Sequence, residues 1–162
     1  PLNEKTTLGP LSSPMQYKKV TALIQTGINE GAKLISGGSE RPADIDAGCY
    51  VSPTIFSQVS NDMTIAREEI FGPVLSILPY ADEAEAISIA NDTDYGLAAY
   101  ISSSDPERAR AIARQLRAGM VKINGAAGDL HLPFGGYKQS GIGREWGAWG
   151  LDEYLETKAV IG

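Results

Sequence analysis

The chain has 162 residues, of which 43% are hydrophobic and 21% are charged, and a net charge of -6 at pH 7. These values predict an ordinary soluble globular protein of one domain, with enough residues to bury a sizeable core. The acidic balance argues against nucleic acid or an anionic membrane as a partner, because both bind basic surfaces. No apolar run approaches the length of a membrane-spanning helix.

The first half of the chain predicts one helix followed by three extended segments. Ser13 and Pro14 form a helix start, since a hydroxyl can cap the first turn and proline suits the first helical position. Apolar residues then recur at helical spacing as far as Ile28, and Gly31 is expected to stop the helix. Extended segments are expected in KLISGG, CYVSPTIFSQV and PVLSIL, and Pro53 predicts a sheet edge or a bulge for the second of them.

The second half alternates predicted helices and strands. Helices are expected to begin at Asp82, with Glu85 completing a capping box, and at Asp105-Pro106. Strands are expected in LAAYISSS, MVKIN and, at the C-terminus, ETKAVI, with a short amphipathic helix in WGAWGLDEYL before the last one. This alternation predicts an α/β fold with a mostly parallel sheet and flanking helices.

The glycine-rich segment from Gly125 to Gly143 predicts no regular element. Loops of this length are usually functional or disordered, and the apolar residues within it argue against disorder. Its glycine spacing matches neither common nucleotide-binding motif, so composition favours a tightly packed, turn-rich connection over a phosphate cradle. His131 has no evident partner in the sequence, which favours a surface or packing role over that of a base.

The chain contains one cysteine, Cys49, and one histidine. No histidine or lysine lies near Cys49 in the sequence to activate its thiol, so an inert thiol is favoured over a nucleophile. A single cysteine excludes an internal disulfide and fits a reducing compartment, so a cytoplasmic location is expected. With one histidine and one cysteine far apart, no zinc or other metal site is expected.

Two adjacent acids, Glu68 and Glu69, precede an aromatic residue and an apolar strand. They form either a solvated turn or a ligand contact, because a carboxylate can accept both hydroxyls of a sugar-like diol and Phe71 could cover a flat ring. Gln16 and Lys19 lie one helical turn apart and could bind a polar ligand, although polar side chains on a helix face more often point into solvent. The residues alone leave both alternatives open.

Six short motifs occur in order along the chain: LGPLSS, GCYVSPTIF, EEIFGPV, ANDTDYGLAAYI, GMVKIN and PFGGYKQSGIGREWG. Together they resemble the aldehyde dehydrogenase superfamily, whose enzymes use NAD or NADP. The likeness covers nearly the whole chain and corresponds to the C-terminal third of a family member. It implies that residues 1–155 are the later part of the catalytic domain and that residues 156–162 begin a tail strand used in subunit association.

The resemblance implies oxidation of an aldehyde to a carboxylic acid through a cysteine thiohemiacetal and thioester. The family's nucleophilic cysteine and general-base glutamate belong to motifs that this sequence lacks, and Cys49 does not stand in the nucleophile's motif. The segment alone is therefore expected to hold no catalytic residue and to be inactive. A homodimer or homotetramer is also implied.

By the same resemblance, four residues are expected to bind the cofactor. Glu69 is expected to bind the hydroxyls of the nicotinamide ribose, and Phe71 to pack near the nicotinamide. Gln16 and Lys19 resemble a family pair that lies along the cofactor, on a shorter match than the others. Glu68 keeps the role of a turn residue.

The segment 125–134 resembles the wall of the family's substrate tunnel, and Phe134 is its one recognisable aromatic residue. Many relatives carry an aromatic residue where Ala127 or one of its neighbours stands. This departure predicts a roomier or more polar tunnel, with Asp129 and His131 among its lining residues.

The alternative function is a non-catalytic oligomerisation or interaction module derived from the same fold. Its C-terminal strand, ETKAVIG, could add to the sheet edge of a partner. A module selected for binding alone has no reason to keep the cofactor-side motif beside an intact tunnel loop, and this favours the enzyme.

Overall fold

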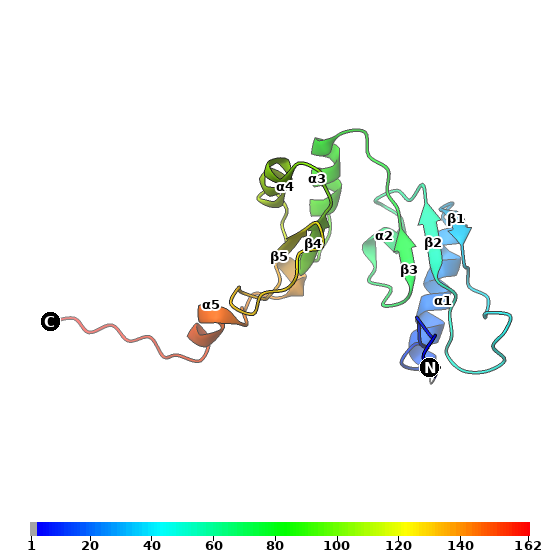
Figure 1. Cartoon of the computed structure of the whole chain (residues 1–162), viewed down its shortest axis with the longest axis horizontal. Coiled ribbons are helices and arrows are strands. Elements are labelled where there is room, and N and C mark those ends of the chain that lie inside the picture. Colours follow the sequence, from blue (N-terminus) through cyan, green and yellow to red (C-terminus); the bar gives the residue numbers. More distant parts are fainter. Residues whose placement is uncertain (1–2) are drawn as a thin grey trace. The chain divides into compact units, whose positions relative to one another are not determined.

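The computed structural model describes residues 3–162, which form two compact units (Figure 1). The N-terminal unit extends to Ala81 and the C-terminal unit begins at Asp82. Each unit contains its own small sheet, one with three strands and one with two. None of the helices in this described range is long and apolar enough to cross a membrane.

The N-terminal unit combines one long helix with a three-stranded sheet. Its elements are α1 (Pro14–Asn29), β1 (Lys33–Ser36), β2 (Thr54–Ser57), α2 (Thr64–Arg67) and β3 (Val74–Ser76). The strand order is β1-β2-β3, with β1 antiparallel and β3 parallel to β2. Because β2 is the central strand, the edge alternative predicted for Pro53 is wrong, and the register shift in the β1–β2 pair lies between Leu34 and Ser36 of β1. Pro53 precedes the first paired residue, so its missing N–H group costs no bond of the ladder.

Helix α1 begins and ends where the sequence predicts. The Ser13 hydroxyl accepts a hydrogen bond from the Gln16 backbone N at 3.2 Å, and Pro14 is the first helical residue. The chain leaves the helix through Gly31, whose φ of 94° lies in the left-handed region that favours glycine. Both capping signals are therefore confirmed.

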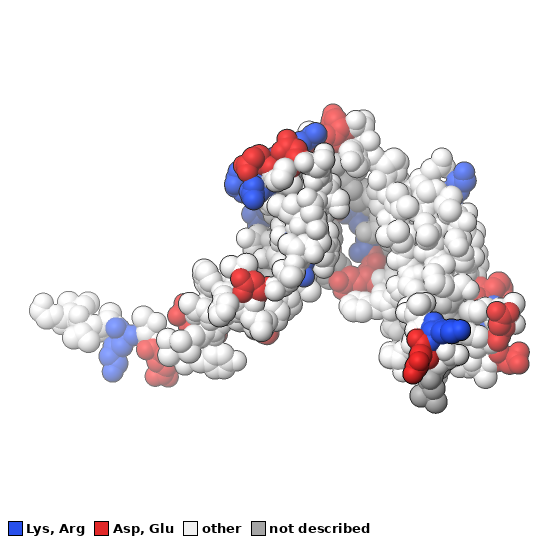
Figure 2. Space-filling model, in the orientation of Figure 1, with Lys and Arg blue, Asp and Glu red and all other residues white. Residues whose placement is uncertain are grey.

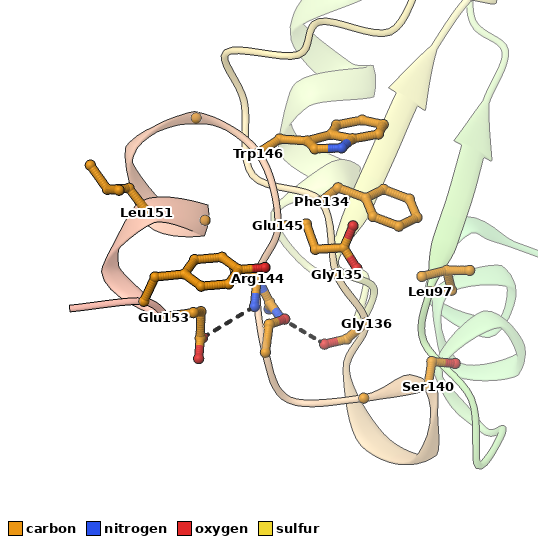
Figure 3. Close-up of a pocket in the computed structure, with 15 residues that line it drawn as sticks. Leu97, Phe134, Gly135, Gly136, Ser140, Arg144, Glu145, Trp146, Leu151 and Glu153 are labelled. Carbon is orange, nitrogen blue, oxygen red and sulfur yellow. Dashed lines mark hydrogen bonds between the residues drawn. The ribbon is translucent and has the colours of Figure 1, made fainter. Parts of the chain in front are cut away.

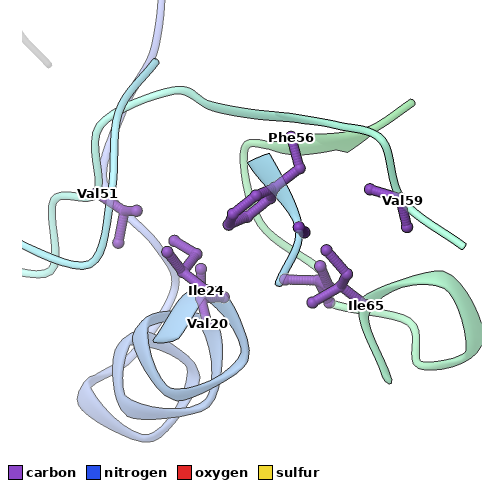
Figure 4. Close-up of a cluster of buried hydrophobic side chains, with 8 residues drawn as sticks. Val20, Ile24, Val51, Phe56, Val59 and Ile65 are labelled. Carbon is purple, nitrogen blue, oxygen red and sulfur yellow. The ribbon is translucent and has the colours of Figure 1, made fainter. Parts of the chain in front are cut away.

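The core of the N-terminal unit lies between α1 and the sheet (Figure 4). Val20 and Ile24, one turn apart on α1, and Phe56 on β2 have no exposed surface. Further buried side chains that complete the cluster include Val51, Val59 and Ile65. This burial fixes which face of α1 points inward, and Gln16 lies one turn before Val20 at the edge of that face.

The C-terminal unit is built around two parallel strands. Its elements are α3 (Glu83–Asn91), β4 (Ala98–Ile101), α4 (Pro106–Ala113), β5 (Met120–Ile123), a 3-10 turn η1 (Lys138–Ser140) and α5 (Gly147–Asp152). Strands β4 and β5 pair from Ala98 with Met120 to Ile101 with Ile123. Helix α4 forms the crossover that a parallel pair requires.

Aspartate side chains begin both α3 and α4. The Asp82 carboxylate accepts a bond from the Glu85 backbone N at 2.9 Å, and the Asp105 carboxylate accepts bonds from two backbone N–H groups at 3.0 Å each. The two predicted helix starts are confirmed. Acidic and basic side chains lie close together over α3 and α4 (Figure 2), where Arg108 pairs with Glu83.

Two backbones approach closely at the start of β5. A Cβ atom built on Gly119 would lie 1.7 Å from the carbonyl oxygen of Gly135, far inside any van der Waals contact. The Gly119 N–H group also donates to the Gly96 carbonyl at 2.9 Å. Glycine is therefore required at 119 for packing, which agrees with the interpretation of the glycine-rich loop as a tightly packed connection.

The α/β fold class is confirmed, since helices flank the sheets and two of the three strand pairs in the described residues are parallel. The strand predicted for ETKAVI is wrong within this chain. Residues 156–162 carry no helix or strand and are exposed, because no strand in the described part of the chain pairs with them. The boundaries 1–155 and 156–162, and a tail strand formed with another subunit, stay predictions.

Candidate functional site

The EEIFGP motif forms a turn, residues 68–73, between α2 and β3. The Glu68 N–H group donates to the Thr64 carbonyl at 2.9 Å, which ends α2. Ile70 is 9% exposed and belongs to the core cluster, so it anchors the middle of the turn. The Pro73 carbonyl accepts a bond from Thr54 N at 2.8 Å and ties the end of the turn to the central strand.

Gln16 and Lys19 on α1 hold the same turn by its carbonyl groups. Gln16 Nε2 donates to the carbonyl oxygens of Ile70 at 3.0 Å and Phe71 at 2.9 Å. Lys19 Nζ donates to the Glu69 carbonyl oxygen at 2.8 Å. The structure therefore brings all four predicted cofactor residues together, and it uses the polar ends of Gln16 and Lys19 to position the turn.

The turn presents an acid and an aromatic ring outward. Phe71 has a φ of 54° and is 70% exposed, and Lys19 Nζ lies 5.9 Å from the centre of its ring. The Glu69 side chain is exposed. Glu68 is exposed as well, so burial does not distinguish the two acids.

Glycine at position 72 brings the turn against α1. A Cβ atom there would lie 2.7 Å from the Val20 side chain, which is fully buried. Gly72 and Pro73 also line an apolar hollow of about 370 Å³ together with the segment 8–11. Residues of the LGPLSS and EEIFGPV motifs thus line the same hollow, although more than fifty residues separate the motifs in the sequence.

The predicted tunnel loop, residues 125–134, follows β5. Both polar atoms of the Asn124 amide bond the backbone of Ser103, each at 2.9 Å, so the loop starts from a fixed point. The Asp129 carboxylate accepts a bond from the His131 backbone N at 2.9 Å, and Ala127, Asp129 and His131 are all exposed. The loop therefore has a local turn of its own, and its role as a tunnel wall stays a prediction.

Phe134 closes the loop through a two-way backbone bridge to Glu145. Phe134 N donates to the Glu145 carbonyl at 2.8 Å, and Glu145 N donates back at 2.6 Å. The Phe134 ring stacks on Trp146, with ring centres 4.7 Å apart and an angle of 28° between the planes (Figure 3). The helix predicted for WGAWGLDEYL includes Trp146, but α5 starts one residue later. The stacked pair follows from no periodic pattern in the sequence.

A cavity of about 700 Å³ lies beside this pair in the C-terminal unit (Figure 3). Phe134, Glu145 and Trp146 line it, together with several backbone glycines. Arg144 Nη1 donates to the carbonyls of Gly136 at 2.9 Å and Gly143 at 2.8 Å, which fixes the glycine wall. The lining therefore combines two acids, Glu145 and Glu153, with three aromatic residues, Phe134, Trp146 and Tyr154, on a backbone frame.

Lys138 connects two of the sequence motifs. Its Nζ donates to the carbonyl oxygens of Asn91 at 2.7 Å and Thr93 at 2.8 Å, at the end of α3. The Ser140 hydroxyl accepts a bond from Gly96 N at 3.0 Å. These contacts join the PFGGYKQSG segment to the ANDTDYGL segment. Lys138 and Ser140 therefore hold the backbone of the ANDTDYGL segment in place.

Cys49 is half-buried, with its thiol free, in the N-terminal unit. Its backbone carbonyl accepts a bond from Leu11 N at 2.9 Å. Among residues 3–162, no three His, Cys, Asp or Glu side chains are grouped so that they could hold a metal ion. That Cys49 is not a nucleophile stays a prediction.

Asp62, in the turn before α2, has a lowered pKa. Its carboxylate accepts a hydrogen bond from the Ser60 hydroxyl, which stabilises the charged form and lowers the pKa. The stability that this bond contributes is present above the unfolded-state pKa and is lost as the pH falls through the folded-state value. Asp62 is not among the predicted site residues, so its lowered pKa affects the stability of the turn before α2 and not the candidate site.

Replacing Gln16 by Ala tests how the turn is held. The change removes both bonds to the Ile70 and Phe71 carbonyls, and we expect a loss of about 1–2 kcal/mol in the free energy of unfolding. Hydrogen exchange followed by mass spectrometry should show faster exchange in residues 68–73. Lys18→Ala is the control, because Lys18 is exposed on the same helix and lies in the sequence between the two residues that hold the turn, Gln16 and Lys19. Unchanged exchange in the Gln16 variant would contradict the anchoring.

Known proteins resemble this chain along its whole length. The model of the aldehyde dehydrogenase family matches residues 1–160. A Pseudomonas sp. protein described as 3-succinoylsemialdehyde-pyridine dehydrogenase is 60% identical over all 162 residues, and a putative aldehyde dehydrogenase of Staphylococcus aureus is 51% identical over the same residues. The chain spans about a third of the length of these relatives, 34% in each case.

Solved structures agree with the family match. A mutant aldehyde dehydrogenase C of Pseudomonas syringae, in complex with NAD+ and octanal, has a TM-score of 0.94 and 51% identity over 98% of this chain and 33% of its own. The NAD+ complex of a Mycobacterium tuberculosis aldehyde dehydrogenase has a TM-score of 0.87 and 49% identity over 91% of this chain and 30% of its own. The chain belongs to the aldehyde dehydrogenase family.

Proposed function

We propose that the chain is part of an NAD(P)-dependent aldehyde dehydrogenase that oxidises an aldehyde to a carboxylic acid. The observation that carries the proposal is the 68–73 turn, which is held by Gln16 and Lys19 and exposes the Glu69 carboxylate beside the Phe71 ring. Two solved relatives with about half of their aligned residues in common with this chain contain NAD+, which favours NAD over NADP. The thiohemiacetal and thioester route implied by the family is part of the proposal.

The residues of the turn fit a nicotinamide nucleotide. An exposed carboxylate can accept both hydroxyls of a ribose, and an exposed aromatic ring can pack against the flat nicotinamide. When bound, the nicotinamide supplies the electron acceptor for the oxidation. Glu69 binds the ribose and Phe71 orients the ring, while Gln16 and Lys19 act through the backbone of the turn.

The substrate is an aldehyde, and its entry path in this proposal runs along residues 125–134. Phe134, Ala127, Asp129 and His131 line that path. The exposed, small side chain of Ala127 supports a roomy tunnel, and the exposed polar residues Asp129 and His131 support a partly polar one. The semialdehyde named for the Pseudomonas relative is the first compound to assay. A cytoplasmic location is part of the proposal, which cell fractionation tests.

The tail at residues 156–162 pairs with another subunit in this proposal. Val160 and Ile161 are 89% and 94% exposed, although both favour strands. A strand that finds no partner in its own chain can complete the sheet edge of a second copy, giving a homodimer or homotetramer.

Glu69→Gln in the full-length protein tests the cofactor role. The variant loses a charge-assisted bond to the ribose, so we expect NAD affinity to fall by about tenfold or more and the step that reduces the nicotinamide to slow. Acylation of the nucleophilic cysteine should be less affected. Titration calorimetry with NAD and single-turnover kinetics measure these effects.

The matched control for that experiment is Glu68→Gln, which removes the same charge from the neighbouring exposed residue. It should leave NAD affinity within about twofold, because Glu68 is a turn residue in this proposal. Equal losses in both variants, or no loss at Glu69, would refute the assignment.

The purified segment 1–162 should not produce NADH from an aldehyde and NAD. The proposal places the nucleophile and the general base outside this segment, so Cys49→Ser should change nothing. A spectrophotometric assay at 340 nm checks this point. Turnover by the segment that survives Cys49→Ser would show that the chemistry had been assigned to the wrong part of the protein.

Placing charges in the tail tests the subunit role. In the full-length protein, Val160→Asp combined with Ile161→Asp should reduce the molar mass measured by light scattering, because two buried carboxylates would disfavour pairing with another subunit. Lys158→Glu is the control for a change of charge alone. An unchanged mass in the double variant would exclude the tail from the interface.

A further inference from the structure

The stacking of Trp146 on Phe134 is a feature of the C-terminal unit that the sequence motifs do not predict. The ring centres are 4.7 Å apart and the planes are 28° from parallel. Both rings line the cavity of about 700 Å³, and Trp146 is 41% exposed (Figure 3). Stacked aromatic pairs hold each other more firmly than their buried area alone predicts.

The backbone around Trp146 fixes the position of its indole ring. Trp146 has a φ of 66° and Gly147 a φ of 57°, two successive left-handed residues that a bulky side chain rarely adopts. Gly147 N donates to the Leu130 carbonyl at 3.1 Å, and a Cβ atom on Gly147 would lie 2.4 Å from the His131 carbonyl oxygen. Residues 146–147 are therefore held directly against the loop that ends at Phe134.

We propose that Trp146 is a specificity-determining residue of the substrate site and that it acts by holding the Phe134 ring in place. This inference rests on the proposed function, in which Phe134 lines the path of the aldehyde. A ring that is already held in place loses little conformational entropy when a flat group packs on it. The gain in binding affinity is therefore largest for an aldehyde with an aromatic ring. A flexible straight-chain aldehyde depends less on the orientation of Phe134.

Trp149 provides a control of the same residue type. It lies three residues further along, is 51% exposed and does not line the cavity. Its replacement removes a similar apolar surface and leaves both rings of the stacked pair present. Any effect that Trp146→Ala shares with Trp149→Ala is therefore a general effect on this part of the fold.

Steady-state kinetics of the full-length protein with benzaldehyde and hexanal provide the first test. Trp146→Ala should raise the KM for benzaldehyde by roughly three- to tenfold, and the KM for hexanal by less than about twofold, with kcat little changed. Trp146→Phe should restore the wild-type ratio, because a phenyl ring can still stack. Trp149→Ala should leave the ratio unchanged.

The second test needs no activity. In full-length protein labelled with 5-fluorotryptophan, the fluorine resonance of Trp146 is identified by its absence in Trp146→Phe. Phe134→Leu should shift this resonance, since it removes the stacked ring, and should leave the Trp149 resonance in place. An unshifted Trp146 resonance would overturn the pairing on which the inference rests.

The outcomes separate the two proposals. If the wild-type protein oxidises neither aldehyde nor any other, the proposed function fails and the specificity inference fails with it. If the enzyme is active and Trp146→Ala leaves the ratio of the two KM values unchanged, the inference alone is wrong. An equal loss of kcat for both aldehydes in a folded variant also overturns it, because that result indicates a structural role.

Discussion

Three hydrogen bonds from one face of α1 determine where the 68–73 turn lies. Residues 69–71 of the turn belong to no helix or strand that could satisfy their carbonyl groups, and an unsatisfied carbonyl beside a core is costly. Gln16 and Lys19 satisfy three of them in succession, from Glu69 to Phe71. Because Val20 and Ile24 fix the rotation of the same helix, the core of the N-terminal unit also sets the position of the exposed Glu69 and Phe71.

The C-terminal unit uses the same principle with different donors. Lys138 donates to two carbonyls at the end of α3, and Arg144 donates to two carbonyls of the glycine-rich segment. In both units, long polar side chains replace secondary structure as the partners of loop backbone. Several polar residues of these motifs therefore stabilise loop backbone, and few polar side chains remain available to bind a ligand.

Much of the fold was predictable because its signals are local. Caps at Ser13, Asp82 and Asp105 depend on residues within one turn, and each begins a helix as expected. The strand predicted at ETKAVI failed for the opposite reason, since a strand depends on a partner that the local sequence does not contain. Helix α3 likewise has no buried residue in the described part of the chain, although it begins at Asp82 as expected.

The residues of the candidate site could be predicted from the sequence, but the contacts that hold them in place could not. The motifs identified Gln16, Lys19, Glu69 and Phe71, and the structure places them together. That the first two bind backbone carbonyls could not be read from a helical spacing of three residues, because the partner lies fifty residues away. The pairing of Phe134 with Trp146 was missed since it follows from an isolated bridge and two left-handed residues, which leave no periodic pattern.

The close approach of Gly119 to Gly135 has a consequence for exchanging segments between relatives. The crowding is between a would-be side chain and a backbone carbonyl, so no adjustment of a neighbouring side chain can relieve it. A chimera whose junction falls between these two positions joins a β5 from one parent to a loop from the other. Such a hybrid packs correctly only where the loop lies at the same distance from the strand in both parents. Residues 119–135 should therefore come from a single parent.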